Sequence, residues 1–134
     1  MNILIIEESE LLMQIIIQSI DKTDNSQVKG VKYLDDIEKE LKNSKYDIII
    51  LNSKVNANEN NRLINLIRQT DKFVYILVIS SETNLNYIEG FYEAGIDYFI
   101  PILFDPKIFN LLLQRIYERI NQFSCIYKGV EWIL

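Results

Sequence analysis

Four aliphatic residues in a row, Ile48 to Leu51, are followed abruptly by the polar Asn52. A short continuous apolar run with polar ends is typical of a strand buried on both faces, as central strands of parallel sheets are. Ligands and chemistry in such open sheets lie beyond the carboxyl ends of the strands. The residues just after Leu51 are therefore where we expect a functional site.

Four other segments have strand character, and apolar residues at helical spacing follow each strand. Strands are expected at 3–6, 27–33, 73–79 and 97–102, with 27–33 at a sheet edge, and helices at about 11–20, 35–41, 63–67, 84–94 and 106–122. An Asn-rich loop at 55–61 is expected before the third helix. Strand and helix thus alternate five times, which predicts an α/β fold with helices on both faces of one parallel sheet. Right-handed crossovers then favour a three-layer, doubly wound, five-stranded sheet in the order 2-1-3-4-5.

The last residues do not continue this alternation. We expect one domain at 1–122 and a tail at 123–134, in which 127–132 resembles a turn and a short strand. The tail is interpreted as the start of a linker, an extra strand or a further module.

Composition excludes several classes of chemistry. The 134 residues carry a net charge of −5 and include one cysteine, Cys125, and no histidine. Catalysis by Ser-His-Asp or Cys-His groups is therefore excluded, and an internal disulfide cannot form. The acidic charge argues against nucleic acid or an anionic membrane as the main partner. Without an apolar span or a basic leader, the sequence predicts a cytoplasmic protein with no membrane contact.

Polar residues at the ends of the predicted strands occur in an ordered set. The segment 3–9 reads Ile-Leu-Ile-Ile-Glu-Glu-Ser, 46–52 reads Tyr-Asp-Ile-Ile-Ile-Leu-Asn, 77–80 reads Leu-Val-Ile-Ser, and 94–105 reads Ala-Gly-Ile-Asp-Tyr-Phe-Ile-Pro-Ile-Leu-Phe-Asp. Over about 2–122 this set resembles the receiver domain of two-component response regulators, which has a flavodoxin-like fold. The resemblance implies a signalling domain in a phosphorelay rather than an enzyme.

The resemblance also assigns roles at the strand ends. It places a phosphoacceptor Asp at Asn52, a hydroxyl that bonds the phosphoryl group at Ser80, and a phosphate-pairing Lys at Ile102. The acidic pair at Glu7 and Glu8 stands where the family binds Mg²⁺. In the family a backbone carbonyl at the position of Lys54 completes the metal site. The resemblance therefore places a metal site at Glu8, Asn52 and Lys54, and we expect this site to be weak or lost.

The departures from the family pattern weaken phosphorylation. A carboxamide is not a useful nucleophile toward phosphorus, so Asn52 prevents formation of an acyl phosphate. The loss of one anion weakens Mg²⁺ binding, and Ile102 cannot pair with a phosphoryl group. We therefore expect a degenerate receiver, a pseudo-receiver, that acts without phosphorylation and needs no cofactor beyond a weak Mg²⁺.

Such a domain would act through protein contacts. The resemblance indicates the face at residues 84–122, where aromatic residues are concentrated, for a protein partner or a homodimer. The residues that we expect to act as a switch or interface are Phe91, Tyr98, Phe99 and Phe109.

Three alternatives remain open at this point. Glu7, Glu8 and Asn52 could hold a divalent cation for a small phosphohydrolase, or the domain could still respond to phosphate, for instance on Ser53. The chain could also be part of a regulator with an effector module. In the absence of metal we expect Lys54 to fold over the site and pair with Glu7 or Glu8.

Overall fold

A computed structural model describes residues 1–20, 26–32, 34–52 and 57–133. Five strands and five helices alternate along the chain. The strands are β1 (Asn2–Ile6), β2 (Gln27–Val31), β3 (Ile48–Asn52), β4 (Tyr75–Ser80) and β5 (Tyr98–Pro101). The helices are α1 (Glu10–Ser19), α2 (Leu34–Asn43), α3 (Ala57–Thr70), α4 (Leu85–Ala94) and α5 (Pro106–Ile133).

All five strands pair in parallel, in the order β2-β1-β3-β4-β5, as the sequence predicts. The central strand β3 lies between β1 and β4, and its Ile48 to Leu51 are at most 2% exposed. Burial on both faces explains why every side chain of this run is aliphatic. The weaker strand β2 is at a sheet edge, also as predicted.

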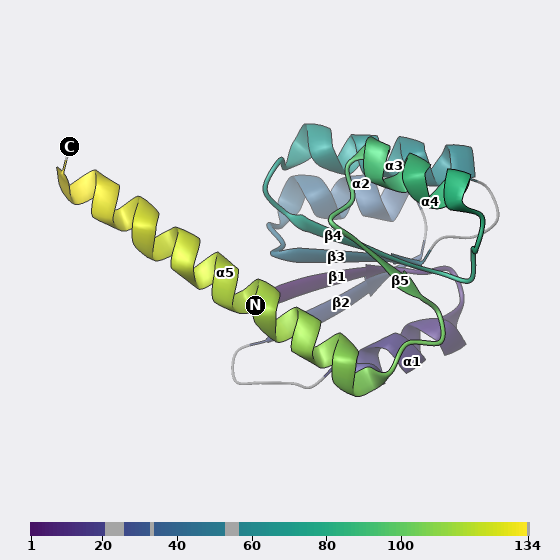
Figure 1. The fold of residues 1–134 in the computed structure, drawn as a ribbon. Coiled ribbons are helices and arrows are strands. Elements are labelled where there is room, and N and C mark those ends of the chain that lie inside the picture. The colour runs from purple at the N-terminus through teal and green to yellow at the C-terminus, as the bar shows by residue number, and fades with distance from the viewer. Residues whose placement is uncertain (21–25, 33, 53–56, 134) are drawn as a thin grey trace.

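The sheet separates two apolar cores. Alternate side chains of a strand point to opposite faces, so Ile50 contributes to one core and Ile49 to the other. Helices α1 and α5 cover the first face, and α2, α3 and α4 cover the second (Figure 1). The result is the predicted three-layer, doubly wound arrangement, with all carboxyl ends of the strands at one edge.

Helix α3 begins earlier than the sequence predicts. The Asn-rich residues 58–61, expected in a loop, lie inside the helix, which starts at Ala57. Asn is unfavourable in a helix interior by less than about 1 kcal/mol per residue, so burial of Ile64 and Ile67 on the same helix outweighs it.

The prediction of a turn and strand in the tail is wrong. Helix α5 continues without a break to Ile133, and its 28 residues correspond to a length of about 42 Å. Its second half extends beyond the sheet (Figure 1). A helix that is already nucleated adds one hydrogen bond per residue, so Gly129, at a cost of about 1 kcal/mol, does not end it.

Arg68 joins four segments on the far side of the sheet from α5. Its Nε donates to Gly95 O at 2.9 Å, and its Nη1 donates to Lys72 O at 3.2 Å and Val74 O at 2.5 Å. Its Nη2 donates to Asp97 Oδ2 at 2.8 Å, and the same oxygen accepts from Ile76 N at 2.8 Å. The guanidinium group therefore links the end of α3 to β4, to the residue that ends α4 and to the start of β5.

Candidate functional site at the carboxyl edge of the sheet

The pairing of the strands brings the predicted site residues into one row. Ile6 pairs with Leu51 and Asn52 pairs with Ile79, so the next residues along, Glu7 and Ser80, lie close to Asn52. The backbone N–H of Ile102 donates to Ser80 O at 2.9 Å, which places Ile102 beside β4. The structure thus brings Glu7, Asn52, Ser80 and Ile102 to one edge, as the sequence indicates.

The two glutamates differ in their surroundings. Glu7 is only 2% exposed, and its Oε1 accepts from the backbone N–H of Ser9 at 2.8 Å. Its Oε2 is buried and has no hydrogen-bond partner in the described part of the chain. Glu8 is exposed. The acidic pocket expected from both side chains is therefore formed by Glu7, because successive residues at a strand end point in opposite directions.

Ser80 is buried, at 3% exposed, at the end of β4. Its hydroxyl oxygen accepts from the backbone N–H of Glu82 at 3.0 Å. This contact shapes the turn that leads to α4, which is the ordinary role of a serine at a strand end. Ile102 is partly buried and packs against the core that α5 covers. An aliphatic side chain therefore occupies the position that the sequence resemblance gives to a cation.

The fit of these residues to Mg²⁺ is limited. Mg²⁺ is usually held by one or two carboxylates together with waters in octahedral geometry. The described residues place one carboxylate inside the site, that of Glu7, beside the neutral amide of Asn52. No cluster of three or more acidic, cysteine or histidine residues that could hold a metal exists among the described residues. Among the described residues, the unpartnered Oε2 of Glu7 is the feature that favours a cation.

The predictions for Lys54 and Ser53 lie outside the described residues. The pairing of Lys54 with Glu7 or Glu8 therefore stays a prediction, as does the alternative of phosphate on Ser53.

Two of the four aromatic residues expected to act as a switch or interface belong to the core. Phe91 and Phe109 are each 2% exposed, on opposite faces of the sheet. Phe99 is partly buried and stacks on Phe91 with the ring centroids 6.3 Å apart, and Tyr98 is also partly buried. Phe91 and Phe109 are thus not available to a partner, because an aromatic side chain on the inner face of an amphipathic helix fills the core.

Other large apolar side chains of residues 84–122 are exposed instead. They are Leu85, Tyr87, Tyr92, Leu103, Ile108, Leu111 and Tyr117. Tyr87 and Tyr92 are among the aromatic residues that the sequence places on this face, whereas the other five were not expected there. In α5 their exposure could be recognised from the sequence, because Ile108 and Leu111 are out of phase with the apolar residues that are buried. The buried side chains that the structure describes in this helix are Phe109, Leu113 and Ile116. We refer to these seven residues as the exposed apolar set.

The free edge of β5 is closed to a further strand. The backbone N–H of Phe99 donates to the hydroxyl oxygen of Tyr92 at 3.0 Å. Pro101, two residues later, has no N–H to offer. Proline and covering side chains are common ways of blocking an edge strand. Contacts at this face would therefore be made by side chains rather than by strand addition.

Comparison with known proteins agrees with the geometry. A family model described as "response regulator receiver domain" matches residues 3–114. A search of curated protein sequences finds no match. In the described part of the chain, no helix has both the length and the apolar character needed to cross a membrane.

Many solved structures share the fold. Three of them are 14 to 19% identical to this chain. A response regulator from Thermotoga maritima is 19% identical with a TM-score of 0.77, and the match covers 86% of this chain and 95% of that chain. DrrB, an OmpR/PhoB homologue from the same organism, is 14% identical with a TM-score of 0.74, and the match covers 88% of this chain but only 52% of DrrB. HP1043, an orphan response regulator of H. pylori, is 18% identical with a TM-score of 0.73, and the match covers 87% of this chain and 95% of HP1043.

Proposed function

This chain belongs to the response regulator receiver domain family, and from that premise we propose that it is a pseudo-receiver, a signalling domain that acts without phosphorylation of Asn52. The observation that carries the proposal is the row of residues at the carboxyl edge of the sheet. Asn52 ends β3 where the family has its acceptor, and Ile102 is beside β4 where the family has its Lys. A carboxamide cannot form the acyl phosphate, and an aliphatic side chain cannot stabilise the phosphoryl charge.

The loss of phosphorylation can be tested directly. After incubation with acetyl phosphate and Mg²⁺, we expect the intact mass of the protein to stay unchanged. Addition of beryllofluoride in the presence of Mg²⁺ should also leave the backbone amide chemical shifts of residues 7–9, 80–84 and 102–105 as they are with Mg²⁺ alone. A mass increase of one phosphoryl group, on Ser53 or on any other residue, would contradict the proposal.

Residual binding of a divalent cation is a second candidate property. Burial of a carboxylate oxygen without a hydrogen-bond partner is unfavourable, and a cation would relieve this cost at Glu7 Oε2. Mg²⁺ itself would be held weakly, because Glu8 is exposed and Asn52 carries no charge. We propose that no catalysis follows from such binding, since the described site offers neither a histidine nor a second buried acid as a general base.

We propose that the domain signals by contact with a protein, and that the partner is a second copy of the chain. The exposed apolar set supports this proposal, because it lies on α4, on α5 and on the loop that precedes α5, around the closed edge of β5. The acidic charge of −5 favours a protein over a nucleic acid as the partner. Symmetric dimers are the commonest oligomers.

A pair of substitutions on the outer face of α5 tests this interface. Ile108 and Leu111 are 64% and 56% exposed, one turn apart. Changing both to Glu should weaken self-association by at least about tenfold, since each buried aliphatic side chain contributes about 1.5 to 3 kcal/mol. Sedimentation equilibrium of the full chain measures the change.

Leu11 on α1 provides the matched control, because it is 72% exposed and lies outside residues 84–122. Leu11→Glu should leave self-association unchanged. A chain that is monomeric at every concentration would rule out the homodimer, and equal effects of the α1 and α5 variants would rule out this face.

A further inference from the structure

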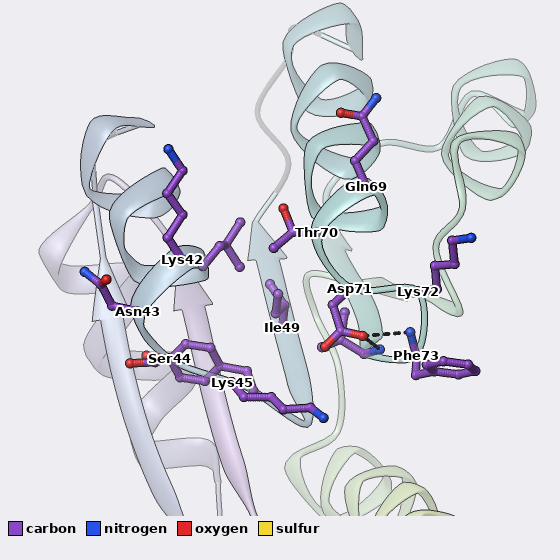
Figure 2. Close-up of a pocket in the computed structure, with 13 residues that line it drawn as sticks. Lys42, Asn43, Ser44, Lys45, Ile49, Gln69, Thr70, Asp71, Lys72 and Phe73 are labelled. Carbon is purple, nitrogen blue, oxygen red and sulfur yellow. Dashed lines mark hydrogen bonds between the residues drawn. The ribbon is translucent and has the colours of Figure 1, made fainter.

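A pocket of about 650 Å³ lies at the opposite edge of the sheet from Asn52, between the carboxyl-terminal ends of α2 and α3. Figure 2 shows Ile49 of β3 between the two helices, with Lys42 and Asn43 on one side and Gln69 and Thr70 on the other. The volume is within the range of roughly 300 to 1,000 Å³ that small-molecule sites occupy. None of the residues to which the receiver resemblance assigns a role lines this pocket.

The floor of the pocket is apolar and rigid. Ile49 and Val74 are 1% and 4% exposed, and Leu41 and Tyr46 pack against the same core. The hydroxyl of Tyr46 donates a hydrogen bond to Glu40. Burial of the side chain is the larger cause, and this hydrogen bond the smaller one, that raises the pKa of Tyr46 to about 12. Glu40 in turn pairs with Lys29, so its charge is already balanced. The ring of Tyr46 is therefore held in place as part of the floor.

The rim of the pocket is cationic. Lys42, Lys45 and Lys72 line it, and none of the three forms an ion pair within the described residues. In Figure 2 Lys45 extends across the lower end of the pocket, whereas Lys42 and Lys72 stand at the outer rims. Their four-carbon stems are flexible enough to bring an ammonium group over a bound ligand.

The negative groups of the pocket do not cancel these charges. Asp71 Oδ1 accepts from the backbone N–H groups of Phe73 and Val74, at 2.8 and 3.1 Å. The two helix ends add about half a negative charge each. Three lysines thus leave about one net positive charge at the pocket of a chain whose overall charge is −5. Phe73, which is 81% exposed, adds an aromatic side chain to the rim.

We propose that this pocket binds a small organic anion, with an apolar or aromatic body on the floor and a phosphate or carboxylate at the lysine rim. Ligand sites commonly combine an apolar lining with a few polar groups that fix orientation. Charge-assisted hydrogen bonds from ammonium groups would hold the anionic end. The proposal goes beyond the pseudo-receiver assignment and does not depend on it, because the pocket shares no residue with the row around Asn52.

The test uses phenyl phosphate and phenylacetate as probes, and the backbone amide chemical shifts of the full chain as the readout. At least one of the two probes should shift residues 41–46 and 69–74 in a saturable way, and comparison of the two identifies the preferred anionic group. Inorganic phosphate, which lacks the apolar body, and benzylamine, which carries the opposite charge, should each bind at least about tenfold more weakly. Equal binding of either one would overturn the proposal, as would the absence of saturable shifts with both anions.

A matched pair of double variants distinguishes binding in the pocket from general attraction of an anion to the charge of the protein. Lys45→Gln with Lys72→Gln should weaken binding of the preferred probe by at least about fivefold, since two charge-assisted contacts are lost. Lys39→Gln with Lys107→Gln removes the same charge from exposed positions outside the pocket and should change the affinity by less than about twofold. Equal losses in the two variants would show non-specific attraction and overturn the proposal.

Discussion

Replacement of Asn52 by Asp together with Ile102 by Lys is expected to make the chain accept a phosphoryl group from acetyl phosphate in the presence of Mg²⁺. The Asp carboxylate supplies the nucleophile that the amide lacks, and the Lys supplies a cation for the phosphoryl charge. Other parts of the site are already in place. Glu7 has a buried carboxylate oxygen without a partner, and Ser80 presents its hydroxyl at the same edge. Intact mass after incubation measures the gain.

Single and matched variants separate the two contributions. Asn52→Asp alone should be labelled roughly 10²-fold more slowly than the double variant, which is the order of effect when one charge-stabilising group is removed from a transition state. Asn52→Asp with Ile102→Met keeps a long apolar stem without the charge and should label as slowly as the single variant. Ile102 is only partly buried, so the Lys stem can pack on the core while its ammonium group reaches the edge.

A double variant that is folded, by its thermal unfolding curve, but remains unlabelled would show that Asn52 and Ile102 are not the decisive departures. The length of the Glu7 side chain, which is one methylene longer than that of Asp, would then be the obstacle. Labelling of the Met control at the rate of the Lys variant would instead remove any role for the cation.

The fold follows from local patterns that the sequence displays openly. Aliphatic runs such as Ile48 to Leu51 have no polar face that could be exposed to solvent, and each run is followed by a helical pattern. A parallel sheet with helices on both faces is the arrangement that buries such runs. Asn84 and Gly95 mark the ends of α4 as their chemistry requires, with Gly95 at φ 117° in the left-handed region.

The site was only partly predictable. The strand ends specify which residues meet at the edge, because the register of parallel strands follows from their burial. They do not specify that Glu7 turns inward while Glu8 turns outward, since two adjacent acids look alike in a sequence. Phe91 and Phe109 were misjudged for a related reason: an aromatic side chain suits a core and an interface equally well, and only helix phase distinguishes them.

The pocket near Ile49 could not be predicted at all. Its residues are Ile49 of the central strand and the segments 41–46 and 69–74, which become neighbours only when α2 and α3 pack on the same face of the sheet. The lysines there resemble the basic residues that often end helices. Their convergence around an apolar floor is a property of the tertiary structure.

Loss of the Arg68 side chain is expected to be the most destabilising change of a single polar residue in this fold. Its guanidinium donates to three backbone carbonyls and to Asp97, and its stem packs on Gly95, where a Cβ would lie 3.2 Å from Arg68 Cγ. In Arg68→Ala the three carbonyls lose this donor and Asp97 loses its ion pair, in a partly buried setting with 22% side-chain exposure for Arg68. We expect a loss of about 2 to 3 kcal/mol in the free energy of unfolding, measured by urea denaturation.

Two further arginine variants show whether the effect comes from the hydrogen bonds. Arg115→Ala removes an exposed arginine that pairs with Glu118 at 3.4 Å, and it should change the stability by less than about 0.5 kcal/mol. Arg68→Lys keeps the charge but replaces the planar fork by one ammonium group, which cannot serve four acceptors in different directions. It should therefore recover less than half of the stability lost in Arg68→Ala. Full recovery by Lys would mean that charge alone stabilises this junction, and that the bonds to Gly95, Lys72 and Val74 contribute little.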